Sequence, residues 1–363
     1  MYKKVKIGLV GCGDVSRKWY LPGIAYAKEI DLISVCDVVE ERAKKAKEDF
    51  SAKEYYLDYS EMLQKADIEA VVNITKPKYH FPLNLEALKA GKHVYTEKTM
   101  ALTLEEADIL IKQADEMGLK LVAAPPVMLA PVNKEIKKII EKGLIGKVCF
   151  VCANSSHSGA ASFDDFTPHP YTTDPTWLYK QGGGPLVDMG VYALHTLTGI
   201  LGPAKRVTAF SGISIPEVIA RSGVVKGKKI KVEVDDNTQL LLDFGENTFA
   251  YLNATYCMKA YKGPDISFYG SEGTVVAAKR ARRDFQVYTE KEEVLGMRGW
   301  ITPLEDKNPN WTIAKGVLHL AECIREDKKP VISAEHARHV IEIIIMAYES
   351  AKSGQAKNLT TTF

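Results

Sequence analysis

Short apolar runs alternate with amphipathic segments along the first third of the chain. The apolar runs cover residues 5–10, 32–36, 70–74, 93–96 and 119–124. Segments with the apolar spacing of helices lie between them, for example at residues 40–49, 81–90 and 104–117. Continuous apolar strands separated by amphipathic helices are typical of βαβ units around a buried parallel sheet. We therefore expect residues 1–124 to form a doubly wound α/β domain with a parallel sheet.

The alternation breaks at Pro125-Pro126, and the rest of the chain has a different pattern. After a predicted helix at 132–142, the predicted strands are longer and lie at 148–156, 206–213, 229–244, 248–256, 266–269 and 285–289. Predicted helices follow Gly184 and cover residues 310–326 and 335–352. Strands without regular crossover helices predict an α+β domain over residues 125–363, with helices on one face of a large, open, mostly antiparallel sheet.

Length and charge exclude several classes of protein. A chain of 363 residues suits two domains, and 48 basic against 46 acidic residues indicate neither nucleic acid nor an anionic membrane as a partner. The longest nearly apolar stretch, residues 189–204, is too short and too polar to span a bilayer. Six scattered cysteines predict no disulfide framework, and the first residues show no secretory signal. We therefore expect a cytoplasmic location.

A glycine-rich turn follows the first predicted strand directly. In Gly11-Cys12-Gly13, the first glycine suits a tight turn and the second allows backbone to approach a pyrophosphate. Asp14 and Val15 then open a helix, whose N-terminus supplies amide donors for phosphate. Such a turn alone is more often structural, but its place between a strand and a helix predicts a dinucleotide site at Gly11, Gly13, Asp14 and Val15.

An acidic residue ends the next predicted strand. Asp37 stands where a carboxylate accepts hydrogen bonds from the ribose hydroxyls of a dinucleotide. Val38 follows it in place of an arginine or serine, which disfavours a 2′-phosphate. We therefore expect NAD rather than NADP, although Arg42, one helical turn further on, leaves NADP open.

Glu97-Lys98 follows the predicted strand at residues 93–96. Because the carboxyl ends of parallel strands face the cofactor crevice, Lys98 is expected at the nicotinamide end. A lysine there can hold a substrate oxygen and stabilise developing alkoxide charge. A surface ion pair is the alternative, but Tyr79-His80 converges on the same edge and favours the site.

A second group of polar residues lies on the helix predicted after Gly184. Asp188, Tyr192 and His195 are spaced i, i+4 and i+7, so they share one face of an otherwise apolar helix. Such a stripe is either a satisfied core network or one wall of a site. Three groups of this kind after a glycine triplet favour the site.

Weaker features add three expectations. His157, just before the aromatic-rich loop at 158–180, and Trp177, within it, are candidates for substrate contact, although the loop's aromatic residues could also pack against one another. Cys149 and Cys152 stand three apart on a predicted strand and so point to opposite faces, which argues for core cysteines. No histidine or acidic cluster has the spacing of a metal site.

The glycine turn, Glu97-Lys98 and the helix start Gly182-Gly183-Gly184, with Asp188 and Gly190 after it, resemble in this order the Gfo/Idh/MocA oxidoreductase family. The resemblance covers essentially the whole chain. It implies a dinucleotide-binding Rossmann domain, a second, open-faced domain and NAD(P)-dependent hydride transfer on a sugar, polyol or cyclitol. It also implies cofactor contacts by the group Thr75, Pro77, His80, Glu97 and Lys98.

The sequence departs from the family pattern at several positions. Ser16 replaces the third glycine, and Thr99 replaces the proline after Lys98. A cis bond before a residue other than proline costs about 2.5–4 kcal/mol, so we expect a trans Lys98–Thr99 bond, or a strained one if the loop geometry is kept. Tyr192 stands where the family often has histidine, and His195 where many members have aspartate.

The resemblance implies a mechanism in which Lys98 and Tyr192 bracket the reacting oxygen. Tyr192 would exchange the hydroxyl proton, which requires a neighbouring ammonium such as Lys98 to lower its pKa from about 10. Asp188 would hold another substrate hydroxyl, and His195 would orient Tyr192 or a substrate oxygen. Proton transfer by His195 or Lys98 itself is the alternative.

Two other functions remain open within the family: a glycosidase that oxidises its substrate transiently with bound NAD, and a dinucleotide-binding regulator without turnover. The retained Lys98, Asp188, Tyr192 and His195 argue against the regulator. The open sheet of the second domain offers a face for self-association, so we expect a homodimer or homotetramer.

Overall fold

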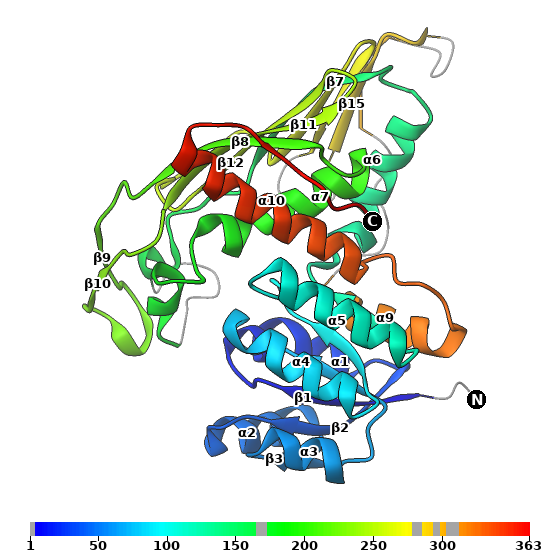
Figure 1. Cartoon of the computed structure of the whole chain (residues 1–363), viewed down its shortest axis with the longest axis vertical. Coiled ribbons are helices and arrows are strands. Elements are labelled where there is room, and N and C mark those ends of the chain that lie inside the picture. Colours follow the sequence, from blue (N-terminus) through cyan, green and yellow to red (C-terminus); the bar gives the residue numbers. More distant parts are fainter. Residues whose placement is uncertain (1–3, 165–172, 278–284, 293–297, 303–311) are drawn as a thin grey trace. The chain divides into compact units, whose positions relative to one another are not determined.

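The structure is a computed structural model that describes residues 4–164, 173–277, 285–292, 298–302 and 312–363 (Figure 1). The chain forms two compact units. The first contains residues 1–129, 310–341 and Phe363, and the second contains residues 130–309 and 342–362. The expected division into 1–124 and 125–363 differs from these units in one main respect, because the chain returns to the first unit at residues 310–341.

The first unit is built on a six-stranded sheet in the order β3-β2-β1-β4-β5-β6. All its strand pairs are parallel, and apolar side chains such as Leu9, Val71 and Val94 are fully buried. This confirms the predicted doubly wound parallel sheet, whose order reverses between β1 and β4. The strands are β1 (Val5–Val10), β2 (Ile30–Cys36), β3 (Glu54–Tyr56), β4 (Ala70–Asn73), β5 (His93–Thr96) and β6 (Leu121–Ala123).

Helices connect and flank these strands (Figure 1). Two of them begin at side-chain caps: Asp58 accepts the N–H of Glu61, and Thr103 accepts that of Glu106. The helices are α1 (Leu21–Ala25), α2 (Glu40–Phe50), α3 (Tyr59–Lys65), α4 (His80–Lys89), α5 (Leu104–Glu116), α9 (Lys315–Glu326) and the first part of α10 (Ala334–Ser353).

The second unit is built on a nine-stranded sheet in the order β16-β15-β14-β13-β7-β12-β11-β8-β17. The pair β7–β12 is parallel and the other pairs are antiparallel, which confirms the mostly antiparallel sheet. Its strands are β7 (Val148–Asn154), β8 (Arg206–Gly212), β11 (Asn237–Gly245), β12 (Thr248–Thr255), β13 (Ile266–Gly270), β14 (Gly273–Ala277), β15 (Phe285–Thr289), β16 (Gly299–Ile301) and β17 (Lys357–Asn358).

The single strand predicted at 229–244 is wrong. Residues 229–231 form β10 (Lys229–Lys231), which pairs with β9 (Glu217–Ile219) in a separate two-stranded sheet, whereas β11 begins at Asn237. The buried carboxylate of Asp236 explains the break. It accepts the backbone N–H groups of Ser214 and Ile215, at 2.6 and 2.9 Å, and so fixes a turn between the two strands.

Helices cover one face of the large sheet. Val151, Leu240, Leu242 and Leu252 are buried on that face, and the backbone of β8 bonds to Ser350 of α10. The helices of this unit are α6 (Pro131–Glu141), α7 (Val191–Leu201) and the second part of α10. No helix in the described residues is long and apolar enough to cross a membrane.

Candidate active site

Each unit carries its own candidate residues. In the first unit, the glycine turn has the backbone that the sequence predicts. Gly11 has φ of 93°, and a Cβ there would lie 2.7 Å from the carbonyl oxygen of Ile74. A Cβ on Gly13 would meet nothing within 4 Å, so the second glycine exposes backbone to open space. This arrangement leaves room for a phosphate group beside the turn.

Asp14 and Val15 lead from this turn into a π-helical turn, Ser16–Tyr20, that precedes α1. The carboxylate of Asp14 lies 3.6 Å from the ammonium of Lys18, one turn further on. Ser16, in the position of the third glycine, is fully buried. The departure from glycine therefore places a small side chain inside the packed start of the helix.

Asp37 ties the end of β2 to the glycine turn. One carboxylate oxygen accepts the N–H of Cys12 at 2.8 Å, and the other accepts the N–H of Val39 at 2.9 Å. Each oxygen of a carboxylate offers about two acceptor positions, so acceptor capacity is left for ligand hydroxyls. Burial raises the pKa of the Cys12 thiol, so this cysteine is an inert part of the turn.

Exposed apolar side chains gather at the carboxyl edge of the parallel sheet. Val15, Val38, Leu57, Tyr79 and Leu102 follow five different strands, from β1 to β5, and all are exposed. Large apolar groups on the surface at the ligand edge of such a sheet indicate a binding surface for flat, partly apolar groups. A nicotinamide dinucleotide has two such groups, its base rings.

Buried amides organise the turn after β4. Asn73 donates to the amide oxygen of Asn84 at 2.9 Å and accepts the hydroxyl of Thr75 at 2.6 Å. Pro77 is buried at the start of a short 3₁₀ turn that leads to α4. Asn73 and Asn84 cannot be predicted from local sequence, because each bonds to the other across two different elements, β4 and α4.

His80 lies between the turns that follow β4 and β5. The ring is fully buried, and its two nitrogens face the carbonyl oxygens of Thr99 at 2.6 Å and Thr75 at 3.0 Å. Carbonyl oxygens only accept hydrogen bonds, and a neutral imidazole carries one N–H, so a neutral His80 ring donates to one of these two carbonyls. Burial, the largest influence, lowers the pKa of His80 against the effect of these two carbonyls.

The turn after β5 holds the candidate lysine. Lys98 donates its backbone N–H to Glu97 Oε2 at 2.9 Å, and the Lys98–Thr99 peptide is cis. The expected trans bond is therefore wrong. The carbonyl of the next residue, Thr99, faces the ring of His80. Glu97 is buried and bonded to Tyr20, so its carboxylate is part of the support of this turn.

In the second unit, Asp188 lies among aromatic side chains. Its Oδ2 accepts the hydroxyl of Tyr256 at 3.1 Å and lies 3.5 Å from Nε2 of His157. The N–H of Gly159 donates to Nδ1 of His157 at 2.8 Å, so the proton of a neutral His157 ring is on Nε2, facing Asp188. His157 also packs against the rings of Tyr256 and Phe163. The structure thus brings together His157 and Asp188, which were predicted separately, and adds Tyr256.

Tyr192 and His195 lie on the helical stretch that follows Asp188. Asp188 belongs to a π-helical turn, Leu186–Gly190, and α7 begins directly after it. Nδ1 of His195 faces the carbonyl of Val191 at 2.8 Å and therefore carries a proton, which leaves Nε2 as the acceptor nitrogen of the neutral ring. His195 is buried and Tyr192 is half-buried.

Trp177 has a packing partner within its own unit. It lies partly buried against a cluster of buried residues that includes Leu178, Tyr179 and Tyr256. The hydroxyl of Tyr179 accepts the N–H of Ala161 at 2.9 Å. Of the other aromatic residues of this loop, Phe166 and Tyr171 lie outside the described residues.

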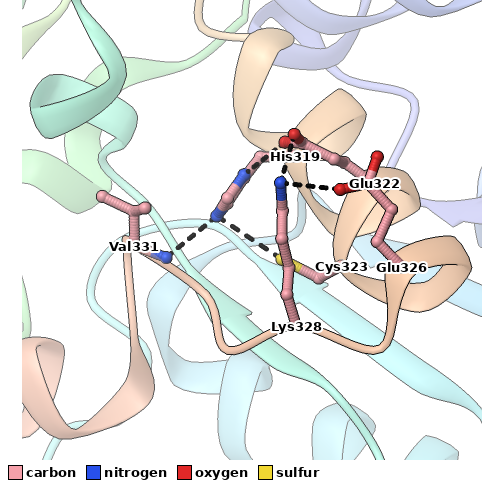
Figure 2. Close-up of polar contacts among 6 residues, drawn as sticks. All are labelled: His319, Glu322, Cys323, Glu326, Lys328 and Val331. Atoms are coloured by element: carbon pink, nitrogen blue, oxygen red, sulfur yellow. Dashed lines mark hydrogen bonds and ion pairs between the residues drawn. The ribbon is translucent and has the colours of Figure 1, made fainter.

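A cysteine–histidine pair on α9 is structural. Figure 2 shows His319 between Glu322 and Cys323: Nδ1 donates to Glu322 at 3.0 Å, and Nε2 accepts the N–H of Val331 at 2.9 Å. Cys323 Sγ lies 3.5 Å from the same Nε2, whose lone pair is already used. Lys328 donates to both Glu322 and Glu326, and burial raises the pKa of Cys323 to about 11. The group ties α9 to the segment after it.

The described residues contain no group of three or more histidine, cysteine or acidic side chains that could hold a metal ion. Cys149 and Cys152 are both exposed, so the expectation of core cysteines is wrong. Cys152 lies on the same face of β7 as the exposed Phe150, and Cys149 lies at a register shift in the pairing of β7 with β13.

Two family models match the chain. Residues 5–124 match the oxidoreductase family with an NAD-binding Rossmann fold, and residues 133–276 match the GFO/IDH/MocA C-terminal domain. A scyllo-inositol 2-dehydrogenase (NADP(+)) of Bacillus subtilis is 25% identical over 364 residues, covering 96% of this chain and 94% of that protein. A D-glucoside 3-dehydrogenase of Escherichia coli is 26% identical over 357 residues, covering 96% of each chain.

Solved structures show the same fold. Levoglucosan dehydrogenase in complex with NADH and levoglucosan superimposes with a TM-score of 0.83 at 20% identity, covering 99% of this chain and 100% of that chain. An aldose-aldose oxidoreductase from Caulobacter crescentus gives a TM-score of 0.81 at 21% identity, covering 98% and 100%.

Proposed function

Because the chain belongs to the Gfo/Idh/MocA family of oxidoreductases, we propose that it transfers a hydride between a nicotinamide dinucleotide and a hydroxyl or carbonyl carbon of a sugar, polyol or cyclitol. One observation on this chain supports the proposal that it binds a dinucleotide. The glycine turn and Asp37 are joined by a hydrogen bond, with Gly13 open toward solvent, which is the geometry that a dinucleotide needs.

The first unit would hold the dinucleotide at Gly11, Gly13, Asp14, Val15 and Asp37, with Thr75 and Lys98 on the neighbouring turns. When bound, the dinucleotide supplies the hydride acceptor or donor. We favour NAD over NADP because a 2′-phosphate would face the Asp37 carboxylate, and Val38 beside it offers no positive charge.

The second unit would hold the substrate. Asp188 accepts a hydrogen bond from Tyr256 and faces Nε2–H of His157, and its carboxylate is proposed to accept a hydrogen bond from a sugar hydroxyl. The rings of His157 and Tyr256, which pack against each other at an interplanar angle of 31°, both lie beside Asp188. Trp177, on the same aromatic cluster, is proposed as a further substrate contact.

Lys98 and Tyr192 are proposed to act at the reacting oxygen. The lysine ammonium would stabilise negative charge on that oxygen, and the tyrosine hydroxyl would exchange its proton. His195, whose Nδ1 is held by Val191, would orient Tyr192 through its acceptor nitrogen Nε2; proton transfer by His195 itself is the second assignment.

We further propose that the chain forms a homodimer or homotetramer through the uncovered face of the large sheet. Phe150, Phe210, Leu241, Phe249 and Tyr251 are exposed on β7, β8, β11 and β12. Cross-strand pairing sets Phe150 beside Phe249 and Leu241 beside Tyr251. A contiguous apolar surface of this kind favours self-association.

A spectrophotometric screen tests the proposed reaction. The purified protein is mixed with NAD, and separately with NADP, and with aldoses, inositols, polyols, sugar phosphates and dihydrodiols, while absorbance is followed near 340 nm. We expect reduction of NAD with one class of substrate, and its loss in Lys98→Met and Tyr192→Phe. Dinucleotide binding without reduction of either dinucleotide by any of these compounds would overturn the proposal and favour the glycosidase or the regulator.

A further inference from the structure

Tyr20 belongs to a buried chain of hydrogen bonds that ends at Lys98. Its hydroxyl donates to Glu97 Oε1 at 2.5 Å and lies 2.9 Å from the hydroxyl of Tyr95. The other oxygen of Glu97 accepts the backbone N–H of Lys98 at 2.9 Å. One carboxylate therefore joins the Tyr20 side chain to the backbone of the candidate catalytic lysine.

The donor and the acceptor in each of these hydrogen bonds follow from the chemistry of the groups. A carboxylate only accepts hydrogen bonds, and each hydroxyl has one proton, so Tyr95 donates to Tyr20 and Tyr20 donates to Glu97. Both rings are fully buried, and their centroids lie 5.7 Å apart. Burial, with Glu97 next in effect, raises the pKa of Tyr20, so the hydroxyl keeps the proton that it donates.

Neighbouring residues pack around this row of hydrogen-bonded groups and hold it in place. A Cβ on Gly316 of α9 would lie 2.5 Å from the ring of Tyr95, so this helix packs directly against the ring. On the other side of Lys98, the carbonyl of Thr99 faces the ring of His80 at 2.6 Å. The backbone is thus held immediately before and after the lysine side chain.

Tyr20 also ends the π-helical turn Ser16–Tyr20, which follows the glycine turn. π-helical turns are frequent at functional sites, and this one directs Tyr20 to Glu97, 77 residues further along the chain. The helix that presents the dinucleotide turn is therefore bonded to the turn that presents Lys98.

We propose that Tyr20 is a positioning residue for Lys98, acting through Glu97. The inference rests on the proposed function for the role of Lys98 in the reaction, but the coupling of Tyr20 to the Lys98 backbone is independent of it. Without the Tyr20 hydroxyl, the buried carboxylate loses a donor, turns toward another one, and releases the N–H of Lys98.

Amide hydrogen exchange on the full chain tests the coupling. The Tyr20→Phe variant removes only the hydroxyl, and we expect the Lys98 amide to exchange about 10-fold faster or more, the loss of one charge-assisted hydrogen bond. Tyr59→Phe is the matched control: Tyr59 is also buried in this unit, and its hydroxyl donates to the carbonyl of Leu83 at 2.9 Å, away from Lys98. It should leave the Lys98 amide unchanged.

Unchanged exchange at Lys98 in Tyr20→Phe, or equal acceleration in both tyrosine variants, would overturn the proposal. If Tyr20→Phe does not fold, Glu97→Gln tests the same link, because the amide offers one oxygen where two donors need acceptors. Faster exchange at Lys98 in that variant supports the proposal, and unchanged exchange overturns it.

Kinetic and binding measurements distinguish the positioning role of Tyr20 from the proposed reaction. Titration with NADH should give the same affinity for wild type and Tyr20→Phe, and with a substrate from the screen kcat should fall about 10-fold while KM for the dinucleotide stays unchanged. A fall in NADH affinity with unchanged kcat would overturn the positioning role. If no compound is turned over, the proposed reaction fails, and hydrogen exchange still decides whether Tyr20 positions Lys98.

Discussion

The hydroxyl of Tyr256 donates a hydrogen bond to Asp188 Oδ2 over 3.1 Å, and so joins the residue after β12 to the π-helical turn before α7. Tyr256 is buried, and its ring packs between those of His157 and Tyr179. Tyr256 therefore fixes the orientation of the Asp188 carboxylate, which we propose binds the substrate.

The Tyr256→Phe variant should weaken substrate binding and leave dinucleotide binding intact. Loss of one hydrogen bond to a carboxylate is worth about 1.5–3 kcal/mol, so we expect kcat/KM for the substrate to fall at least 10-fold. Steady-state kinetics and NADH titration measure the two effects. Tyr179→Phe, which removes the neighbouring hydroxyl that accepts from Ala161, is the control. Equal losses in both variants would mean that Tyr256 acts only through packing.

Asp37 makes the choice of dinucleotide testable. Replacing it with alanine removes the carboxylate, and we expect the ratio of NAD to NADP affinity to fall about 10- to 100-fold. Asp37→Asn keeps one oxygen for the N–H of Cys12 and loses the charge, so it separates support of the turn from repulsion of a phosphate. Unchanged selectivity in both variants would contradict the role of Asp37. Dinucleotide titration by fluorescence gives the ratio.

The two glycines of the turn should respond differently to alanine. Gly11 has a positive φ, and a Cβ would lie 2.7 Å from backbone, so Gly11→Ala should lower the melting temperature with or without ligand. Gly13→Ala adds a methyl group in open space. It should leave the apo melting temperature unchanged and remove most of the stabilisation by added dinucleotide. Full stabilisation of Gly13→Ala by NAD would show that the ligand binds elsewhere.

The parallel sheet follows from the sequence because its main strands are nearly continuous apolar runs, and the large sheet follows from longer strands without crossover helices. The elements that could not be predicted lie where the local sequence pattern carries little information. The strand β3 and the helix α3 were not predicted, since β3 has three residues and all are half-buried. The strands β10 and β11 were merged because the turn between them depends on Asp236 bonding to backbone more than 20 residues away.

The same limit applies to the candidate site. The glycine turn, Asp37, Lys98 and Asp188 have recognisable local settings, so the sequence suffices to propose them as site residues. Tyr256 lies 68 residues from its partner Asp188, and Tyr20 lies 77 from Glu97. Neither has a neighbouring residue that marks it as different from an ordinary core tyrosine. Only the folded structure shows which buried hydroxyl meets which carboxylate.

Cysteine reactivity should follow exposure rather than the presence of a histidine. Burial raises the pKa of Cys323 to about 11 and that of Cys36 to about 12, so both remain protonated thiols at neutral pH. Cys149 and Cys152 are exposed. Iodoacetamide at neutral pH should label these two first, with Cys323 protected until the protein unfolds. Early labelling of Cys323, located by mass spectrometry, would show that His319 activates it.

Glu342 should make the second unit sensitive to acid. Its buried carboxylate accepts the backbone N–H and side-chain hydroxyl of both Thr360 and Thr361, and so ties α10 to the last residues of the chain. Burial alone would raise the pKa of Glu342, but the hydrogen bonds from Thr361 and Thr360 outweigh it and hold the pKa below 4.5. A carboxylate with a lowered pKa stabilises the folded state above its unfolded pKa, and this stabilisation is lost as pH falls through the folded value.

Glu342→Gln should therefore lower the free energy of unfolding by about 1–3 kcal/mol at pH 7, and by less as the pH falls below the ordinary glutamate value. Glu349→Gln, on an exposed position of the same helix, is the matched control and should change stability by less than about 0.5 kcal/mol. Urea unfolding of both variants between pH 7 and about pH 3.5 measures the difference. A destabilisation by Glu342→Gln that is constant over this range would mean that the packing of the side chain, and not its charge, ties α10 to Thr360 and Thr361.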